Sequence, residues 1–120
     1  MMSIIIYHNP RCSKSRKTLQ LLEEAGVSPR VVEYLSAPPS AATTLKHAAL
    51  LGVPVAGLLR RGEADFKDAT DLPDLDDDAA LAEWLETHPK VIERPIVVDE
   101  ANNRAVVGRP PENVLELIRK

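Results

Sequence analysis

The sequence predicts a small α/β fold with a mixed sheet, and three observations support this prediction. An apolar, β-branched run (3–7) is followed by a helical pattern (13–25) and a second β-rich run (30–35). Two further β-rich runs with a turn between them (96–98 and 104–107) lie near the other end of the chain. The stretch between these halves carries only helical patterns. A strand–helix–strand succession favours a parallel strand pair and a hairpin is antiparallel, so both pairings are expected.

The first half has the clearest element boundaries. Leu19, Leu22 and Ala25 recur at helical spacing, and Gly26 stands where a helix is expected to end. The β-rich run 30–35 follows after a short connection. This order is typical of a βαβ unit, in which the helix lies against both strands.

The middle of the chain is predicted to form a helical insertion. Ser40 follows two prolines and is a suitable N-cap for the first helix, and Asp77 or Asp78 is suitable for the last. Three helices are expected there: one up to about Leu51, one over Val55–Arg61 and one up to about Thr87. His88-Pro89 then ends the last of them.

The second half is predicted to be a hairpin followed by a helix. Asn102-Asn103 separates the two late β-rich runs, and Pro110-Pro111-Glu112 opens the last helix. The whole order matches a thioredoxin-like fold: a small mixed four-stranded sheet flanked by helices, with a helical insertion between its βαβ and ββα halves. We expect a single domain over residues 1–120.

Composition excludes several classes of function. The net charge of −3 argues against non-specific nucleic-acid binding, which usually needs a basic face. No apolar run approaches the ~20 residues of a membrane span, and the start of the chain lacks a signal-peptide pattern. One cysteine excludes an internal disulfide and a zinc site built from several cysteines. We therefore expect a cytoplasmic monomer with no bound cofactor and no nucleic-acid or membrane partner.

Cys12 is the single cysteine, and it occupies the most reactive kind of position in the chain. It lies between an apolar strand pattern and a helical one, at or just before a helix N-terminus. Backbone N–H groups and the helix dipole favour an anion there. Arg11, Lys14 and Arg16 add positive charge to the same turn. Because such surroundings lower the pKa of a thiol, we predict a nucleophilic thiolate rather than an inert packed cysteine.

Two polar neighbours could tune this thiol. Cys12 and Ser15 have the Cys-x-x-Cys spacing of thiol–disulfide oxidoreductases, with serine replacing the second cysteine. Such a site forms a covalent adduct that only an outside thiol can resolve. The Ser15 hydroxyl would favour the thiolate if it bonds the sulfur, and is otherwise a helix residue without a partner. His8 would lower the pKa of the thiol if it is protonated nearby, and is otherwise a loop residue facing water.

Arginine suits a tetrahedral oxyanion because its planar fork donates several hydrogen bonds and stays charged. Arg60, Arg94 and Arg109 are candidates for such a clamp, although each taken singly is more typical of a solvated surface residue. Pro95 opens the strand pattern that follows it. Thioredoxin-like folds place a cis proline there, facing the cysteine, so Pro95 is predicted to be cis.

No metal site is predicted. The acidic run 74–78 lacks the spaced oxygen ligands and the glycine of a calcium loop, so we interpret it as a solvated helix start. His47 and His88 have no metal-ligand partners at useful spacing, and both are expected at the surface.

A series of motifs resembles the glutaredoxin-linked arsenate reductase family over essentially the whole chain. The motifs are Tyr7-His8-Asn9-Pro10-Arg11-Cys12-Ser13-Lys14-Ser15-Arg16, Tyr34-Leu35 with Pro38-Pro39, Leu58-Leu59-Arg60, Glu93-Arg94-Pro95-Ile96-Val97-Val98 and Gly108-Arg109-Pro110-Pro111-Glu112. Their order and number make this resemblance far more specific than the Cys-x-x-Ser spacing.

The resemblance implies a thioredoxin-like fold and a chemistry. The Cys12 thiolate attacks arsenate, glutathione adds to the enzyme-bound arsenic as co-substrate, and glutaredoxin then releases arsenite. The family's histidine and serine, which tune the pKa of the cysteine, match His8 and Ser15.

The resemblance also implies three arginines that bind the oxyanion, and these match Arg60, Arg94 and Arg109. Arg61 competes with Arg60 for its role, and Arg104 competes with Arg109. The segment 99–108 differs from that of established arsenate reductases, and the chain stops soon after its last helix. Both features resemble a shorter branch of the family.

Two alternatives stay open. One is a thiol reductase of this fold with a different electrophile. The other is a thioredoxin-like regulatory module that binds RNA polymerase. Such regulators typically keep a Cys-x-x-Cys switch, which Ser15 removes here, and the arginine set would have no purpose in one. We therefore prefer the oxyanion reductase.

Overall fold

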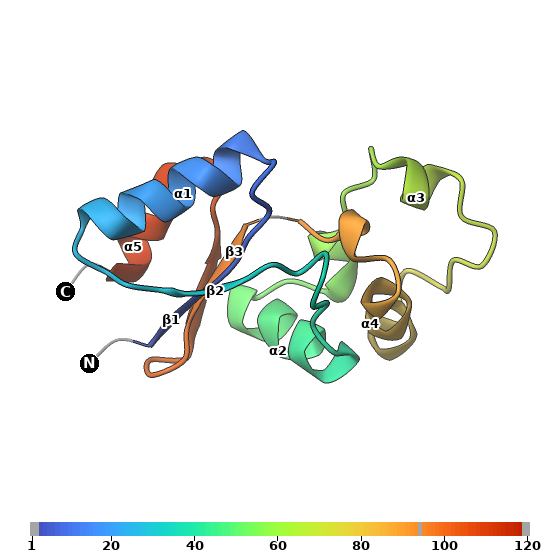
Figure 1. Ribbon diagram of the computed structural model, residues 1–120. Coiled ribbons are helices and arrows are strands. Elements are labelled where there is room, and N and C mark those ends of the chain that lie inside the picture. The colour runs from blue at the N-terminus through green and yellow to red at the C-terminus, as the bar shows by residue number, and fades with distance from the viewer. Residues whose placement is uncertain (1–2, 94, 119–120) are drawn as a thin grey trace. The chain divides into compact units, whose positions relative to one another are not determined.

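The computed structural model describes residues 3–93 and 95–118, which form two compact units. The first unit is built from both ends of the chain, up to Tyr34 and from residue 95 onward, and the second spans Leu35–Glu93. Figure 1 labels helices and strands of both units. The single domain expected over residues 1–120 stays a prediction.

The first unit is a mixed four-stranded sheet in the order β2-β1-β3-β4. The strands are β1 (Ile4–Tyr7), β2 (Arg30–Val32), β3 (Ile96–Asp99) and β4 (Arg104–Val107). β1 pairs in parallel with β2 and antiparallel with β3, and β3 and β4 form the predicted antiparallel hairpin. Asn103 lies in the hairpin turn with a φ of 51°, a left-handed conformation that asparagine tolerates. The thioredoxin-like sheet predicted from the element order is confirmed.

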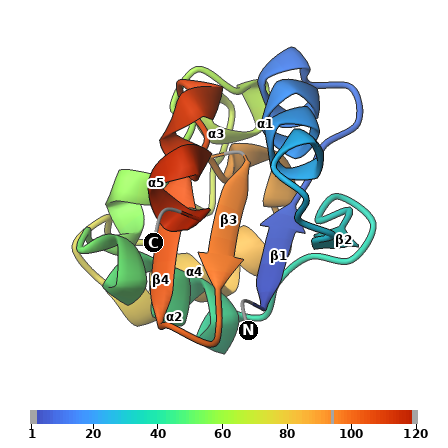
Figure 2. The same cartoon turned by 90° about the vertical axis from the view of Figure 1, so that its left-hand side faces the viewer.

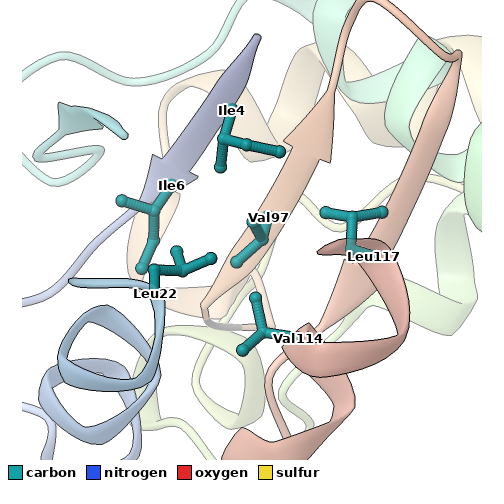
Figure 3. Packing of buried hydrophobic residues seen from close by; sticks show 6 residues of the cluster. All are labelled: Ile4, Ile6, Leu22, Val97, Val114 and Leu117. Atoms are coloured by element: carbon teal, nitrogen blue, oxygen red, sulfur yellow. The ribbon is translucent and has the colours of Figure 1, made fainter. Parts of the chain in front are cut away.

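Two helices of this unit, α1 (Ser13–Glu24) and α5 (Val114–Ile118), cover one face of the sheet (Figure 2). Their apolar side chains meet those of β1 and β3 in one cluster (Figure 3). The buried members are Ile4, Ile6, Leu22, Val97, Val114 and Leu117. The predicted helical spacing thus places Leu22 in the core, and this packing holds α1 at a fixed height above β1.

The second unit is helical, as predicted for the insertion. Its elements are α2 (Ala41–Leu51), η1 (Val55–Leu58), α3 (Ala64–Lys67), α4 (Asp78–Glu86) and η2 (Pro89–Val91). The Ser40 side chain accepts from Thr43 N, and the Asp77 side chain accepts from Ala80 N, so both predicted N-caps are confirmed. Gly52 ends α2 in the left-handed conformation, with a φ of 70°.

Three expectations for the elements differ from the structure. β2 ends at Val32 rather than residue 35, because residues 34–36 turn. The segment predicted as a helix over Val55–Arg61 is the shorter 3-10 helix η1, since Leu59 is extended and bridges Ile92. The helix α3 (Ala64–Lys67) was not predicted, since its four residues give too little periodicity.

His47 is a further correction, because it is buried rather than at the surface. It lies on α2 with 4% of its surface exposed. Burial and, to a smaller extent, the Lys46 ammonium lower the pKa of His47 to about 4, so the imidazole is neutral in the folded protein near pH 7. His88 is partly buried and stacks on Trp84, with ring centroids 4.0 Å apart.

Candidate active site

Cys12 is the N-cap residue of α1, as the sequence predicts. Its backbone is extended, with φ −95° and ψ 121°, and its carbonyl accepts the first helical hydrogen bond from Arg16 N at 3.0 Å. Its own N–H donates to Asn9 O at 3.0 Å, which closes the turn between β1 and α1. The residue is half-buried. The sulfur therefore belongs to a residue whose backbone is fixed at the positive end of a helix.

Asn9 shapes that turn, a role that sequence reasoning missed. Its Oδ1 accepts from Arg11 N at 3.0 Å and its carbonyl accepts from Cys12 N, while the residue is 8% exposed. A side chain that bonds the backbone two residues on forms an Asx-turn, and Asn before Pro is typical of one. The Asn9-Pro10 dipeptide between a strand and a helix was the available signal.

His8 and Ser15 lie together, behind the turn. His8 Nδ1 and Ser15 Oγ share a hydrogen bond of 2.6 Å, and Asn9 N donates to the same Oγ at 3.0 Å. Ser15 is fully buried, and His8 is 6% exposed. The structure therefore excludes the open readings in which Ser15 has no partner and His8 faces water.

The pKa of His8 is lowered, chiefly by burial. The Arg16 guanidinium also lowers it, while the Glu33 carboxylate opposes the change. A lowered pKa favours the neutral imidazole at pH 7. A positively charged His8 beside the sulfur is thus not the favoured state.

Arg109 lies beside Cys12. Its Nη2 donates to Cys12 Sγ at 4.0 Å, across 97 positions of sequence. Arg104, its competitor, instead donates from Nη2 to Glu116 O at 3.1 Å. Among the two candidates for the third arginine, the structure places Arg109 at the sulfur.

Gly108 lets the Arg109 loop approach α1 closely. A Cβ at this position would lie 2.5 Å from Thr18 Oγ1 and 2.8 Å from Pro95 Cγ. Gly108 N also donates to Pro95 O at 2.8 Å. No side chain fits between these groups, so glycine is required here for contact rather than for an unusual φ. This residue was part of a motif, but sequence alone gave no reason for it.

Pro95 is buried just before β3, at the position that the sequence predicts. Arg94, and with it the Arg94–Pro95 peptide bond predicted to be cis, lies outside the described residues. A cis bond joins Arg109 to Pro110.

Arg60 lies in the second unit, at the end of η1. Its guanidinium forms ion pairs with Glu63 at 3.4 Å and Glu93 at 3.5 Å, and its backbone N donates to Val91 O. Nη1, the atom that pairs with Glu63, is buried and makes no hydrogen bond within the residues that the structure describes. Arg61 is exposed. Arg60 is thus the more constrained of the two candidates.

Three cationic residues next to Cys12 in the sequence, Arg11, Lys14 and Arg16, are exposed. Arg16 also donates to Pro10 O at 3.0 Å. No group of three or more metal-ligating side chains occurs within residues 3–93 and 95–118. Within the same ranges, no helix has both the length and the apolar character needed to cross a membrane.

The ArsC family model matches residues 7–117. A protein named arsenate reductase from Neisseria meningitidis is 46% identical over 116 residues, which is 95% of this chain and 97% of the relative. An Escherichia coli relative named "Uncharacterized protein YfgD" is 49% identical over 94% of each chain.

Solved structures show the same relationship. A structure described as an arsenate reductase from Vibrio cholerae has a TM-score of 0.86 and 44% identity, and the match covers 98% of each chain. The family model and these relatives each match nearly the full length of the chain. The chain belongs to the ArsC family.

Proposed function

We propose that the protein reduces arsenate to arsenite through a Cys12 thiolate adduct that glutathione and glutaredoxin resolve in the cytoplasm. The observation that carries this proposal is the contact of Arg109 Nη2 with Cys12 Sγ. Arg109 is 97 positions from Cys12 in the sequence, yet its guanidinium lies beside the thiol. A cation in that place stabilises both the thiolate and an anion that approaches it. The relatives named arsenate reductase support arsenate as that anion.

The arginines bind the oxyanion in this proposal. Arg109 holds the anion against the sulfur, and Arg94 stands next to Pro95 in the sequence. Arg60 matches an oxyanion-binding position of the family, and its buried Nη1 lies 3.4 Å from Glu63 Oε1 without a hydrogen bond to any described residue. The two carboxylates paired with Arg60 fix the orientation of its guanidinium.

His8 acts on Cys12 through Ser15. A neutral His8 with its proton on Nδ1 donates to Ser15 Oγ, which also accepts from Asn9 N. Both acceptor sites of the hydroxyl are then occupied, so its own proton is available to the Cys12 sulfur. A hydroxyl that donates to sulfur favours the thiolate, and no charge on His8 is needed.

The chemistry needs two outside thiols. Attack by Cys12 forms an S–As bond and releases one arsenate oxygen as water, and glutathione displaces a second oxygen in the same way. Reduction of As(V) to As(III) takes two electrons. The bound glutathione and a glutaredoxin thiolate supply them and leave as a mixed disulfide, after which water releases arsenite from Cys12. Ser15 stands where an internal resolving cysteine would be, so the chain does not supply the second thiol itself.

The direct test is arsenate reduction by the purified protein. We expect arsenite to form only when glutathione and glutaredoxin are both present, and Cys12→Ser to abolish it. Ser28→Ala is the matched control, because Ser28 is exposed and is not among the proposed site residues. Turnover that persists without an added thiol contradicts the mechanism, and no turnover under any condition favours another electrophile or a regulatory role.

Anion binding separates an enzyme from a binding module without turnover. Sulfate should protect Cys12 from alkylation, and Arg94→Ala or Arg109→Ala should weaken this protection about tenfold, since each removes charged hydrogen bonds. Arg104→Ala is the control, because Arg104 bonds Glu116 O instead. If none of the arginine variants changes the protection, the oxyanion site is wrong.

A further inference from the structure

Arg109 lies in the loop between β4 and α5. The Asn113 side chain holds this loop by hydrogen bonds, and the proposed chemistry gives it no role. Asn113 is the last residue of η3 (Pro111–Asn113). Its Nδ2 donates two hydrogen bonds, to Val107 O at 3.2 Å and to Arg109 O at 3.1 Å. A primary amide has two N–H donors, so Asn113 uses both of them to bond the backbone next to and at Arg109.

Three backbone hydrogen bonds also hold this loop in place. Arg109 N donates to Val107 O at 2.9 Å, and Gly108 N donates to Pro95 O at 2.8 Å. Asn113 N donates in turn to Pro110 O at 3.0 Å. Both backbone polar groups of Arg109 are therefore bonded, and the bond to its carbonyl comes from the Asn113 side chain.

This backbone restraint matters because the contact that it supports is long. Arg109 Nη2 reaches Cys12 Sγ at 4.0 Å. The arginine side chain has many rotamers, and holding one of them costs conformational entropy even with the backbone fixed. A loop that moves by about 1 Å takes the guanidinium away from the sulfur, and misplacements of that size have large effects at active sites.

We infer that Asn113 is a positioning residue for Arg109. It fixes the Val107–Arg109 backbone so that the guanidinium faces the Cys12 sulfur and any anion bound there. The inference deepens the proposed function and rests on it only for the identity of the anion.

The test reads the Cys12 thiol directly and needs no arsenate turnover. Asn113→Ala removes both hydrogen bonds, and Asn113→Leu removes them while keeping the volume of the side chain. For each variant, the rate of Cys12 alkylation by iodoacetamide is measured against pH, with and without sulfate. We expect the midpoint of the thiol titration to rise and sulfate affinity to fall about fivefold.

A double-mutant cycle identifies the route of the effect. If Asn113 acts through Arg109, Asn113→Leu should change neither quantity further once Arg109 is already alanine. A merely structural role would leave the effect of Asn113→Leu the same in both backgrounds. Equal effects in the two backgrounds, or an unchanged titration in the folded variants, overturn the inference.

Asn102→Ala is the matched control. The Asn102 amide donates to Asp99 Oδ2 at 2.7 Å, in the β3–β4 turn at the opposite end of the hairpin from Arg109. Its loss should leave the thiol titration unchanged. Thermal unfolding identifies which variants are folded, and Asn113→Leu is used where the alanine variant is not. Coupling between Asn113 and Arg109 in a protein that does not reduce arsenate would support this inference and reject the proposed function. Arsenate reduction without that coupling would support the proposed function and reject this inference.

Discussion

At the scale of single residues, small polar side chains around Cys12 fix the backbone rather than meet solvent. The Asn9 side chain accepts from one backbone N–H across its turn, and the Asn113 side chain donates to two backbone carbonyls. Thr18 Oγ1 donates to Lys14 O at 2.8 Å within α1 and is fully buried. Such bonds leave few conformations for the residues that would touch an anion, so the chemistry depends on side chains that do no chemistry themselves.

Gly108→Ala should destabilise the protein by about 1–3 kcal/mol, because the new Cβ would overlap groups that cannot easily move. Those groups are Thr18 Oγ1 at 2.5 Å and Pro95 Cγ at 2.8 Å. The free energy of unfolding from urea titrations measures the effect. Thr18→Ala should restore part of the loss in the double variant.

Gly62→Ala provides the comparison for this prediction. A Cβ at Gly62 would meet nothing within 4 Å, so this variant should unfold at the wild-type urea concentration or above it. Equal stability of the two alanine variants would show that the close contact at Gly108 is not tight.

At the scale of elements, the charged side chains at the two ends of α1 are unfavourable for the helix dipole. It has no acidic residue in its first turn and no basic residue in its last, while Lys14 lies in the first turn and Glu24 ends the helix. Each mismatch costs about 0.3–1 kcal/mol at an exposed helix end. The burial of Leu22 and the βαβ connection offset that cost, and a positive potential stays at Cys12.

The elements also differ in how well sequence predicts them. The caps of α2 and α4 were found at Ser40 and Asp77, because cap chemistry is local. The end of β2 was not predicted correctly, because its pairing with β1 stops at Val32 although β-rich residues continue in the sequence. Strand length depends on the partner strand, which a local pattern does not contain.

The buried histidine of α2 predicts a loss of stability in acid. The pKa of His47 is about 4 in the folded protein, against an ordinary value of 6.5. The unfolded chain therefore binds a proton between these values while the folded one does not, so stability falls as pH decreases from 6.5 to 4. The difference in pKa corresponds to about 3 kcal/mol in total.

His47→Gln should flatten that pH dependence, with urea unfolding measured at pH 7, 6, 5 and 4.5, roughly the titration window of a depressed histidine. Part of the slope should persist, because the pKa of His8 is lowered as well. Ser28→Ala is the control and should keep the wild-type slope, because Ser28 is exposed and carries no titratable group. An unchanged slope in His47→Gln would show that His47 is not buried in its neutral form.

At the scale of the whole molecule, the arrangement around Cys12 was predictable where the residues are close in sequence. Cys12 is the N-cap of α1 and Ser15 lies in its first turn, and the change from a strand pattern to a helical pattern in the sequence marks this position. The choice between Arg104 and Arg109 was not predictable, because it depends on where β4 ends relative to β3. The role of Asn113 is visible only once the carbonyls it bonds are placed beside one another.

The single thiol of the chain makes a whole-molecule prediction. Treatment with oxidised glutathione should add one glutathione per chain, at Cys12, because there is no second cysteine to displace it. Intact mass spectrometry measures the adduct, and Cys12→Ser should remain unmodified. Ser15→Cys should shed the adduct by forming an internal disulfide. A wild-type protein that sheds glutathione without an added thiol would contradict the need for an outside partner.

The chain separation of Cys12 and Arg109 has a consequence for synthesis on the ribosome. The 97 positions between them take about 5–20 s to translate at common elongation rates, and β3 and β4 emerge within the same interval. Until then β1 lacks its antiparallel neighbour, and the sulfur lacks the guanidinium that lies beside it in the finished fold. We therefore expect the nascent thiol to be less acidic than the mature one. Cys12 would become a reactive thiolate only when almost all of the polypeptide has been made.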